Sequence, residues 1–418
     1  MPRKQKTHYP IAVIGGGIVG LTAMLGLVRQ GKDCILISPE MTEPDGKTSA
    51  LLAQTVDFLD TLDIWIEASS FAYPLKTMRI IDGTKRLIRA PQTDFNASEI
   101  KRDAFGYNIE NKKLGALLNS KLENFAEFQH LKSELISIES FDAASDKTTY
   151  KLETQSGSII TADIVIACDG RNSIVRTGLQ IGERSWQYPQ IALVGNFTHT
   201  LPNNDTSTEF HAETGPFTLV PLGSHRSSLV CVVNQSGADT LLATEPEQLN
   251  LHLEQKMQSI LGKVQMEGQL KSFPLSGMVA KSFAKGSALL AGEAAHVFPP
   301  IGAQGLNLGL RDVASLLKLL ASSNISPSEI GAEYQKLRAA DILARTASVD
   351  ILNRSLLSDF LPVQAGRSFG LFALGSLGSL RRFMMREGIA PGTSLKPELP
   401  KKNPLEFIAD KIRSSRST

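Results

Sequence analysis

The chain has 418 residues, of which 42% are hydrophobic and 21% charged, and its formal net charge is +2. Such a composition is that of a globular protein with room for two domains, and the balanced charge excludes a nucleic-acid-binding surface. The three cysteines, Cys34, Cys168 and Cys231, have no metal-binding spacing, which indicates buried free thiols and no metal site. Glycines interrupt the first apolar run, so no secretory signal is predicted, and no stretch approaches the roughly 20 residues of a membrane helix. We therefore expect a cytoplasmic protein that at most lies on a membrane surface.

A glycine-rich turn follows the first predicted strand. Residues 11–14 form a wholly apolar run, which is typical of a parallel strand buried on both faces. Gly15, Gly17 and Gly20 then have the G-x-G-x-x-G spacing: the first allows the turn, the second admits a pyrophosphate, and the third lets the helix pack closely. The strand–turn–helix–strand order predicts a dinucleotide-binding site. The alternative is a glycine-rich turn that serves packing alone.

The acidic residue expected at the end of the second strand, where it would bind the adenosine ribose, is absent. Ser38 stands at that position, and Glu40 lies two residues further on, where the strand period of two turns it to the same side. A hydroxyl in place of an ionised acceptor gives up about 1–2 kcal/mol of binding. We expect Ser38 or Glu40 to make the ribose contact.

Two later segments carry related signals. Residues 161–176 read TADIVIACDGRNSIVR, which predicts a buried strand ending in Asp169 and Gly170 before a helix. Residues 289–312 read LLAGEAAHVFPPIGAQGLNLGLRD, which predicts a strand, a loop rich in proline and glycine, and a second helix. The N-terminus of that helix presents a positive end suited to an anion or a polar ring edge.

These three segments, in this order, resemble the class A flavoprotein aromatic hydroxylases, the family that includes p-hydroxybenzoate hydroxylase. The resemblance implies that the first turn binds the ADP half of FAD and that Asp169 lies near the pyrophosphate, where a nicotinamide cofactor passes. The late motif would hold the ribityl chain and the isoalloxazine ring, so that the two glycine turns bind opposite ends of one molecule. The residues that the resemblance assigns to this second end are Glu293, in place of the usual Asp, with Pro299, Gly302, Gly305 and Asn307.

His296 and Asp312 belong to the same motif but have a simpler interpretation. A histidine that caps or packs beneath the loop is favoured over a catalytic acid-base, and an aspartate two helical turns past Gly305 is favoured as structural. The sequence identifies no general base, and the catalytic residues remain unassigned.

Several less specific sequence matches resemble one branch of the family, the hydroxylases of ubiquinone biosynthesis, which oxidise a polyprenylated phenol. Residues 45–52 resemble its D-x-R-T-x-A-L element, with Lys47 in place of the arginine near the flavin; lysine keeps the charge without the bidentate fork. Residues 105–118, 215–222 and 367–374 resemble three further elements of that branch.

The implied fold is α/β, with a Rossmann-like FAD-binding domain of the p-hydroxybenzoate hydroxylase type, an antiparallel β-sheet substrate domain and C-terminal helices. Its expected boundaries are 1–75, 101–183 and 284–325 for the FAD-binding domain, 76–100 and 184–283 for the substrate domain, and 326–418 for the C-terminal region.

Alternating β-rich runs separated by turn residues over 186–235 predict the antiparallel sheet. A sheet over the flavin encloses a dry cleft that protects a reactive oxygen species from water. Phe217 and Leu219 alternate on one face and Pro221 follows at the strand end, so these residues either line the substrate pocket or form the sheet core.

Residues 367–386 combine apolar side chains near helical spacing with a cluster of arginines. A basic amphipathic helix of this kind can lie on an anionic bilayer. The alternative is a helix packed against the FAD-binding domain.

The resemblance implies an FAD-dependent monooxygenase, in which reduced flavin and O2 form a C4a-hydroperoxide that transfers one oxygen atom to the phenol ring. NAD(P)H or another reductant would visit transiently as electron donor, since no second nucleotide turn is present. The expected partners are a lipophilic phenol, O2, and either a membrane surface or a complex of ubiquinone biosynthesis. The alternatives are a hydroxylase of another small aromatic compound, a related epoxidase or halogenase, an NAD dehydrogenase, and a protein that holds FAD without catalysis.

Overall fold

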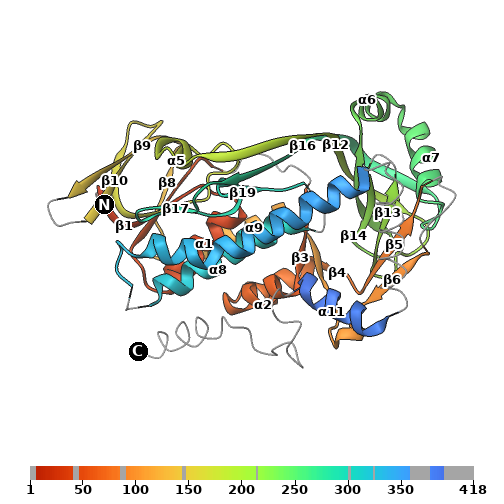
Figure 1. Cartoon of the computed structure of the whole chain (residues 1–418), viewed down its shortest axis with the longest axis horizontal. Helices are drawn as coiled ribbons and strands as arrows, with labels where there is room; N and C mark the ends of the chain where they lie inside the picture. Colours follow the sequence, from red (N-terminus) through yellow and green to blue (C-terminus); the bar gives the residue numbers. More distant parts are fainter. Residues whose placement is uncertain are drawn as a thin grey trace.

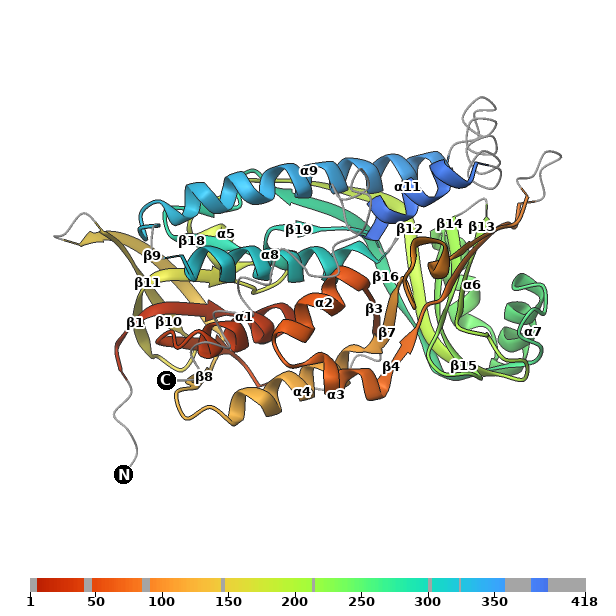
Figure 2. The same cartoon turned by 90° about the horizontal axis from the view of Figure 1, so that it is seen from below.

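A computed structural model describes residues 6–40, 47–84, 91–143, 147–212, 215–299, 303–322, 325–357 and 377–389. Figures 1 and 2 show an elongated molecule, with a layered α/β part at one end and a sheet-rich part at the other. Two sheets of eight strands and one of three strands form its framework. The predicted fold class, a Rossmann-like domain joined to an antiparallel sheet, is confirmed.

The first sheet forms the α/β part, and its central strands are parallel. Residues 11–14 are at most 3% exposed, because helices and further strands cover both faces of this segment, as the apolar run predicts. The strands in spatial order are β17 (Ala284–Lys285), β18 (Ala288–Leu290), β11 (Ile159–Ala167), β1 (His8–Ile14), β2 (Cys34–Ser38) and β8 (His130–Lys132), with β10 (Lys147–Thr154) and β9 (Leu135–Ala143) extending from β11.

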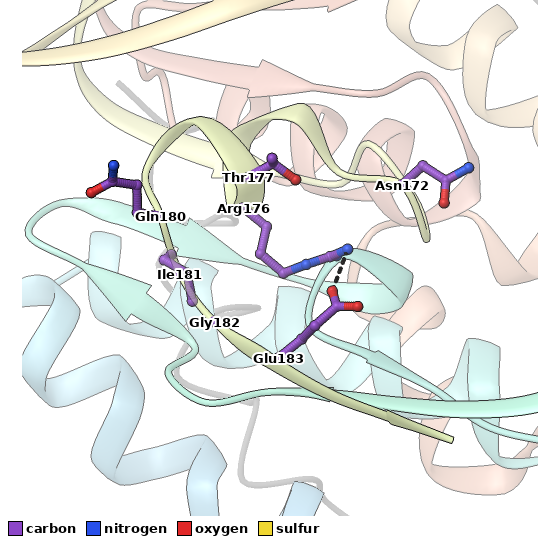
Figure 3. A pocket seen from close by; sticks show the side chains of 7 residues that line it. All are labelled: Asn172, Arg176, Thr177, Gln180, Ile181, Gly182 and Glu183. Atoms are coloured by element: carbon purple, nitrogen blue, oxygen red, sulfur yellow. Dashed lines mark ion pairs between the residues drawn. The ribbon is translucent and has the colours of Figure 1, made fainter. Parts of the chain in front are cut away.

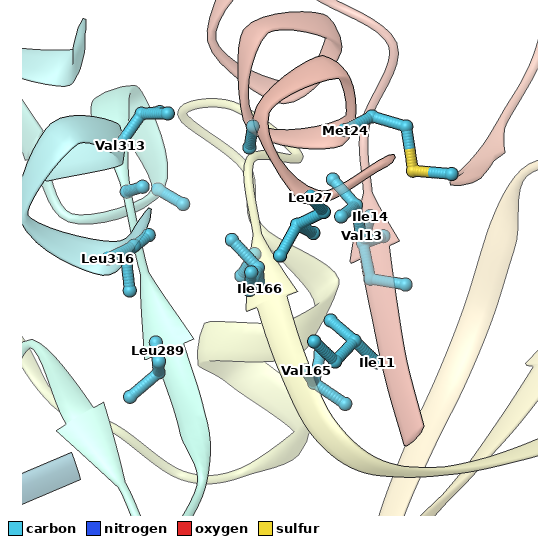
Figure 4. Packing of buried hydrophobic residues seen from close by; sticks show 14 of the residues in the cluster. Ile11, Val13, Ile14, Met24, Leu27, Val165, Ile166, Leu289, Val313 and Leu316 are labelled. Carbon is cyan, nitrogen blue, oxygen red and sulfur yellow. The ribbon is translucent and has the colours of Figure 1, made fainter. Parts of the chain in front are cut away.

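Helices α1 (Ile18–Arg29) and α8 (Gln304–Leu320) pack side by side against the parallel strands. Figure 4 shows Leu27 of α1 and Leu316 of α8 reaching toward Ile166 and its neighbours in one continuous core. The other helices of this part are α2 (Ala53–Thr61), α3 (Trp65–Ala68), α4 (Asn111–Glu123), α5 (Ile174–Gly178) and α9 (Ile330–Leu357), with the short 3-10 turns η1 (Ser69–Phe71) and η3 (Gly292–Ala294).

The second sheet is antiparallel except for the pair β13–β5. Helices α6 (Gln235–Ala243) and α7 (Pro246–Lys256) cover one of its faces and enclose a separate apolar core. The strands in spatial order are β19 (His296–Val297), β16 (Val264–Ala280), β12 (Glu183–His199), β15 (Arg226–Val233), β14 (Gly215–Pro221), β13 (Thr206–Ala212), β5 (Thr77–Asp82) and β6 (Thr93–Asn96).

A small third sheet joins the two parts, and helix α11 (Gly378–Ile389) lies beside the turn η2 (Ala97–Ile100), near the sheet-rich part (Figure 2). The strands of the third sheet are β3 (Thr48–Leu52), β7 (Gly106–Glu110) and β4 (Ala72–Pro74). Among the helices of the described ranges, none has the length and apolarity required to cross a bilayer. The domain boundaries expected from the sequence stay a prediction.

All three cysteines are free thiols. Burial raises the pKa of Cys34 to about 12, and it also raises the pKa of Cys168 and of Cys231. These thiols are therefore protonated at neutral pH and act as small apolar side chains.

Candidate flavin site

The three glycines of the first turn have different surroundings. A Cβ atom on Gly15, which has φ +106°, would lie 2.3 Å from the carbonyl oxygen of Cys168, and one on Gly20 would lie 1.9 Å from the carbonyl oxygen of Gly15. A Cβ on Gly17 would meet no atom within 4 Å. Gly15 and Gly20 thus allow close packing, while Gly17 faces open space at the start of α1.

The N-terminus of α1 is available to an anion. Its N-cap is Gly17, no side chain makes a capping hydrogen bond, and the first turn contains no acidic residue. The backbone N–H groups there have no intrahelical acceptor, and the helix dipole adds partial positive charge. This arrangement fits a pyrophosphate beside Gly17.

Asp169 follows β11 and lies next to the same turn. Its Oδ2 accepts a hydrogen bond from the Val175 backbone N–H at 3.1 Å, whereas its buried Oδ1 has no partner among the described residues. Burial raises the pKa of this carboxyl group. A buried oxygen without a donor costs roughly 1–3 kcal/mol, so this position fits a hydroxyl or N–H group supplied by a bound cofactor.

Ser38 and Glu40, the two candidates for the ribose contact, occupy different environments. Ser38 is 3% exposed and its Oγ lies 3.0 Å from His130 Nε2, directly under the turn, where a Cβ on Gly16 would approach it to 2.5 Å. Glu40 is exposed and accepts a hydrogen bond from Lys132 at 2.5 Å, which lowers the pKa of Glu40.

We predict that Ser38→Ala or Glu40→Ala raises the dissociation constant of FAD by about 5- to 20-fold, the loss of one hydrogen bond to a ribose hydroxyl. Fluorescence titration of the FAD-free protein measures it. Lys132→Ala is the control, because it removes the partner of Glu40 without removing an acceptor. An unchanged dissociation constant in both Ser38→Ala and Glu40→Ala refutes the ribose assignment.

The late motif begins with a tight turn, which we call the Glu293 turn (residues 292–296). The Glu293 side chain is exposed, while Asp312 of α8 lies fully buried beneath the turn. Asp312 Oδ2 accepts a hydrogen bond from the Gly292 N–H at 3.0 Å and lies 2.7 Å from His296 Nε2. Burial acts to raise the pKa of Asp312, but its interactions with His296 and Arg338 and the hydrogen bond from the Gly292 N–H outweigh burial, so the pKa of Asp312 is lowered. His296 is thus held beneath the loop, in the packing role favoured from the sequence.

The remaining residues of the motif lie at the start of α8. Pro299 is buried, Gly302 lies outside the described residues, and Gly305 is exposed, with open space where a Cβ would stand. Helix α8 has no side-chain cap and no acidic residue in its first turn. Its N-terminus can therefore stabilise negative charge on a flavin ring edge.

Asn307 makes contacts that sequence reasoning did not anticipate. Its side chain is 2% exposed; Oδ1 accepts from the Leu52 N–H at 2.8 Å, and Nδ2 donates to the carbonyl oxygens of Ala50 and Ala303 at 2.8 and 2.6 Å. These bonds fasten β3 to the first turn of α8. No local pattern reveals this role, because the partners lie more than 250 residues apart.

Lys47 immediately precedes β3 and lies at the junction with the second sheet. Its ammonium group is 4.7 Å from the centroid of the Phe273 ring on β16, within the range of a cation–π contact. The neighbouring Thr48 donates a hydrogen bond to Ser228 Oγ on β15 at 2.9 Å. The structure thus places Lys47 between β3 and the face of the second sheet that carries Phe273 and Ser228.

Phe217 and Leu219 point to the opposite face of that sheet. Phe217 is 1% exposed, with its ring centroid 5.9 Å from that of Phe210 and 5.3 Å from the Lys256 ammonium of α7. Both side chains belong to the core enclosed by α6 and α7, and Pro221 at the strand end is also buried. Because successive strand residues alternate between faces, it is the half-buried Thr218 that lies on the face turned toward Lys47.

The face turned toward Lys47 was not predicted from the sequence, because both faces of β14 carry apolar residues. Val230 pairs with Thr218 and with Val194, and Ser228 pairs with Val220 in the same register. Ser228 is buried and the other members of this set are half buried, whereas the opposite face of these strands carries the buried Leu219, Leu229 and Cys231. They form a mainly apolar wall beside the predicted flavin position.

Arg176 connects the Asp169 segment to the Glu293 turn. Its guanidinium donates to the Ala294 carbonyl oxygen at 2.9 Å and to that of Arg171 at 2.7 Å, and it forms an ion pair with Glu183 at 2.7 Å. Figure 3 shows this pair beside a pocket of about 470 Å³ that is lined by residues 172, 176, 177 and 180–183. Because three protein acceptors already engage the guanidinium, we assign no ligand to this pocket.

These residues make up the candidate site for a dinucleotide, with Gly17 and Lys47 at its two expected ends. Residues 8–339 match the model of the FAD binding domain family, and the chain therefore belongs to that family and uses FAD. It is an oxidoreductase of the flavin-dependent monooxygenase class.

Curated relatives agree with the branch indicated by the sequence. The chain is 30% identical over 403 residues to "Ubiquinone hydroxylase UbiL" of Rhodospirillum rubrum, covering 94% of this chain and 91% of that protein. It is 28% identical over 387 residues to "3-demethoxyubiquinol 3-hydroxylase" of Escherichia coli, covering 89% of this chain and 96% of that protein. The predicted resemblance to the ubiquinone branch is confirmed.

Among solved structures, p-nitrophenol 4-monooxygenase PnpA from Pseudomonas putida DLL-E4 superposes with a TM-score of 0.75 at 18% identity. The match covers 92% of this chain and 98% of that one. This similarity supports the overall fold, including the arrangement of the α/β part and the sheet-rich part.

Proposed function

We propose that this protein hydroxylates the aromatic ring of a polyprenylated phenol in ubiquinone biosynthesis, with FAD as cofactor, O2 as the oxygen source, and NAD(P)H or another transient reductant as electron donor. The observation that carries the proposal is the likeness to two named ubiquinone hydroxylases over about nine-tenths of the chain. A flavin supplies the reduction of O2 when bound. The chain's own residues supply binding, orientation and the exclusion of water.

The proposal gives these residues the following roles. Gly17 and the N-terminus of α1 would hold the pyrophosphate, Asp169 would bind a cofactor hydroxyl, and Lys47 would supply a positive charge near the ring. The half-buried wall that contains Thr218 and Val230 provides an apolar surface for the phenol ring and keeps water away.

The test uses purified, FAD-loaded protein with NADPH or NADH, a short-chain polyprenylphenol and 18O2. We expect substrate-stimulated oxidation of the nicotinamide and a product that contains one 18O atom, detected by mass spectrometry. A phenol with the same ring and no prenyl tail is the matched control, and we expect it to react at least tenfold more slowly. Equal turnover of both phenols favours a hydroxylase of small aromatic compounds, and an epoxide or halogenated product contradicts ring hydroxylation.

We also propose that α11 attaches the protein peripherally to the cytoplasmic face of the inner membrane. One side of α11 contacts the protein, through an ion pair of Arg381 with Glu99 at 2.7 Å and through the buried Met385. Four large apolar side chains at the start of α11 and within it are exposed, as is Arg382. These side chains are Leu377, Leu380, Phe383 and Met384. Residues 358–376, which include the rest of the predicted basic amphipathic segment, lie outside the described residues.

Flotation with vesicles of phosphatidylglycerol and phosphatidylethanolamine tests this attachment. We expect Leu380→Ser combined with Phe383→Ser to reduce the bound fraction at least fivefold while the unfolding temperature stays unchanged, because both side chains are exposed. Ile66→Ser is the control, since Ile66 is 73% exposed but lies on α3. Equal binding of the wild type and the double variant contradicts the proposal.

A further inference from the structure

The Glu293 turn is held at both of its ends by one carboxylate. Asp312 accepts from the Gly292 N–H at the start of the turn and lies 2.7 Å from His296 at its end. Residues 292 and 312 also bracket the whole late motif in the sequence. A displacement of Asp312 is therefore transmitted to both ends of the segment that presents Glu293 and leads to α8.

Asp312 is held in turn by an arginine from a different part of the chain. Arg338 of α9 donates from Nε to Asp312 Oδ1 at 2.7 Å, and the two side chains are 6% and 0% exposed. A buried carboxylate that loses its charged partner is destabilised by several kcal/mol unless it moves or takes up a proton. Arg338 thus supplies the buried guanidinium that binds Asp312 Oδ1, the oxygen that does not contact the turn.

The contacts continue from Arg338 along α9. Asp341 accepts from Arg338 at 2.8 Å and from Arg311 of α8 at 3.1 Å. Arg345 lies 3.9 Å from Asp341 and donates to the carbonyl oxygen of Glu387 in α11 at 3.3 Å. An unbroken series of polar contacts therefore runs from α11 to the Glu293 turn.

We propose that Arg338 is a positioning residue of the flavin site. Through Asp312 it fixes the Glu293 turn in the geometry that receives the cofactor, although Arg338 itself belongs to α9, in the predicted C-terminal region. Arg176 also binds this turn, directly through the Ala294 carbonyl oxygen, so two arginines from distant segments hold it, one directly and one through Asp312.

The test compares Arg338→Met with Arg311→Met. Arg311 is the matched control because it also pairs with Asp341 across the α8–α9 interface and is 16% exposed, yet it makes no hydrogen bond with Asp312 in the described contacts. We expect Arg338→Met to raise the dissociation constant of FAD at least tenfold and to shift the reduction potential of the bound flavin. In the FAD-free protein, the Gly292 amide should exchange with deuterium at least tenfold faster. Arg311→Met should lower the unfolding temperature while changing the FAD dissociation constant and the Gly292 exchange less than threefold.

Arg338→Lys keeps the positive charge but loses the planar donor, and we expect an FAD dissociation constant between those of the wild type and Arg338→Met. If Arg338→Met does not fold, Arg338→Lys and Arg311→Lys replace the pair, and the same difference in Gly292 exchange is expected. Equal FAD dissociation constants and equal Gly292 exchange in the Arg338 and Arg311 variants overturn the proposal. None of these measurements depends on the identity of the phenol.

Discussion

Gly20→Ala is expected to destabilise the folded protein by at least about 3 kcal/mol, since its Cβ would lie 1.9 Å from the carbonyl oxygen of Gly15. Neither atom can move alone, because Gly20 belongs to α1 and Gly15 forms the turn that leads into it. We expect the loss in urea unfolding of the FAD-free protein, which separates stability from cofactor binding.

Gly17→Ala is the matched comparison. We expect it to leave the stability nearly unchanged and to weaken FAD binding. With φ −71° and no atom within 4 Å of a new Cβ, the substitution changes the free energy of unfolding of the FAD-free protein by less than about 1 kcal/mol. It fills the space assigned to the pyrophosphate, so the FAD dissociation constant should rise by a factor on the order of 100. A Gly17→Ala protein that binds FAD normally contradicts the placement of the cofactor beside this residue.

Asn307→Ala is the second substitution with a large expected effect. It leaves the Leu52 N–H and the Ala50 and Ala303 carbonyl oxygens without their side-chain partner at a buried site, which costs roughly 3 kcal/mol in total. Because β3 begins next to Lys47, we also expect a rise of at least tenfold in the FAD dissociation constant, measured by fluorescence titration.

Asn203→Ala controls for the loss of a buried amide. Asn203 is 6% exposed and lies within the sheet-rich part, where its Nδ2 donates to the Gly223 carbonyl oxygen at 2.6 Å and its Oδ1 accepts from the Asp205 N–H at 3.2 Å. A similar loss of stability with unchanged FAD affinity is expected. If both variants weaken FAD binding equally, the effect of Asn307→Ala reflects general destabilisation and the role assigned to Asn307 is wrong.

The sequence predicts well those parts of the fold whose physical cause lies within one short segment. The glycine turn is such a case, because the positive φ of Gly15 and the close contact of Gly20 with the Gly15 carbonyl oxygen lie within six residues. The apolar run at 11–14 is another, since burial on both faces leaves a visible pattern.

The parts that the sequence does not predict depend on contacts between distant segments. Phe217 illustrates this: alternation places it on one face of β14, but only the position of α6 and α7 decides that this face is the core and that Thr218 faces Lys47. Phe273 lies more than 200 residues from Lys47, and no local pattern links the two. Arg338 likewise lies outside every motif that carries the resemblance.

Strands β12 and β16 have 17 residues each and pair along almost their whole length, passing from the α/β part into the sheet-rich part. At roughly 3.3 Å per residue they span about 55 Å. These two paired strands therefore belong to both halves of the molecule. Neither half can be excised without cutting these two strands, so we expect the two halves to melt together as one cooperative unit.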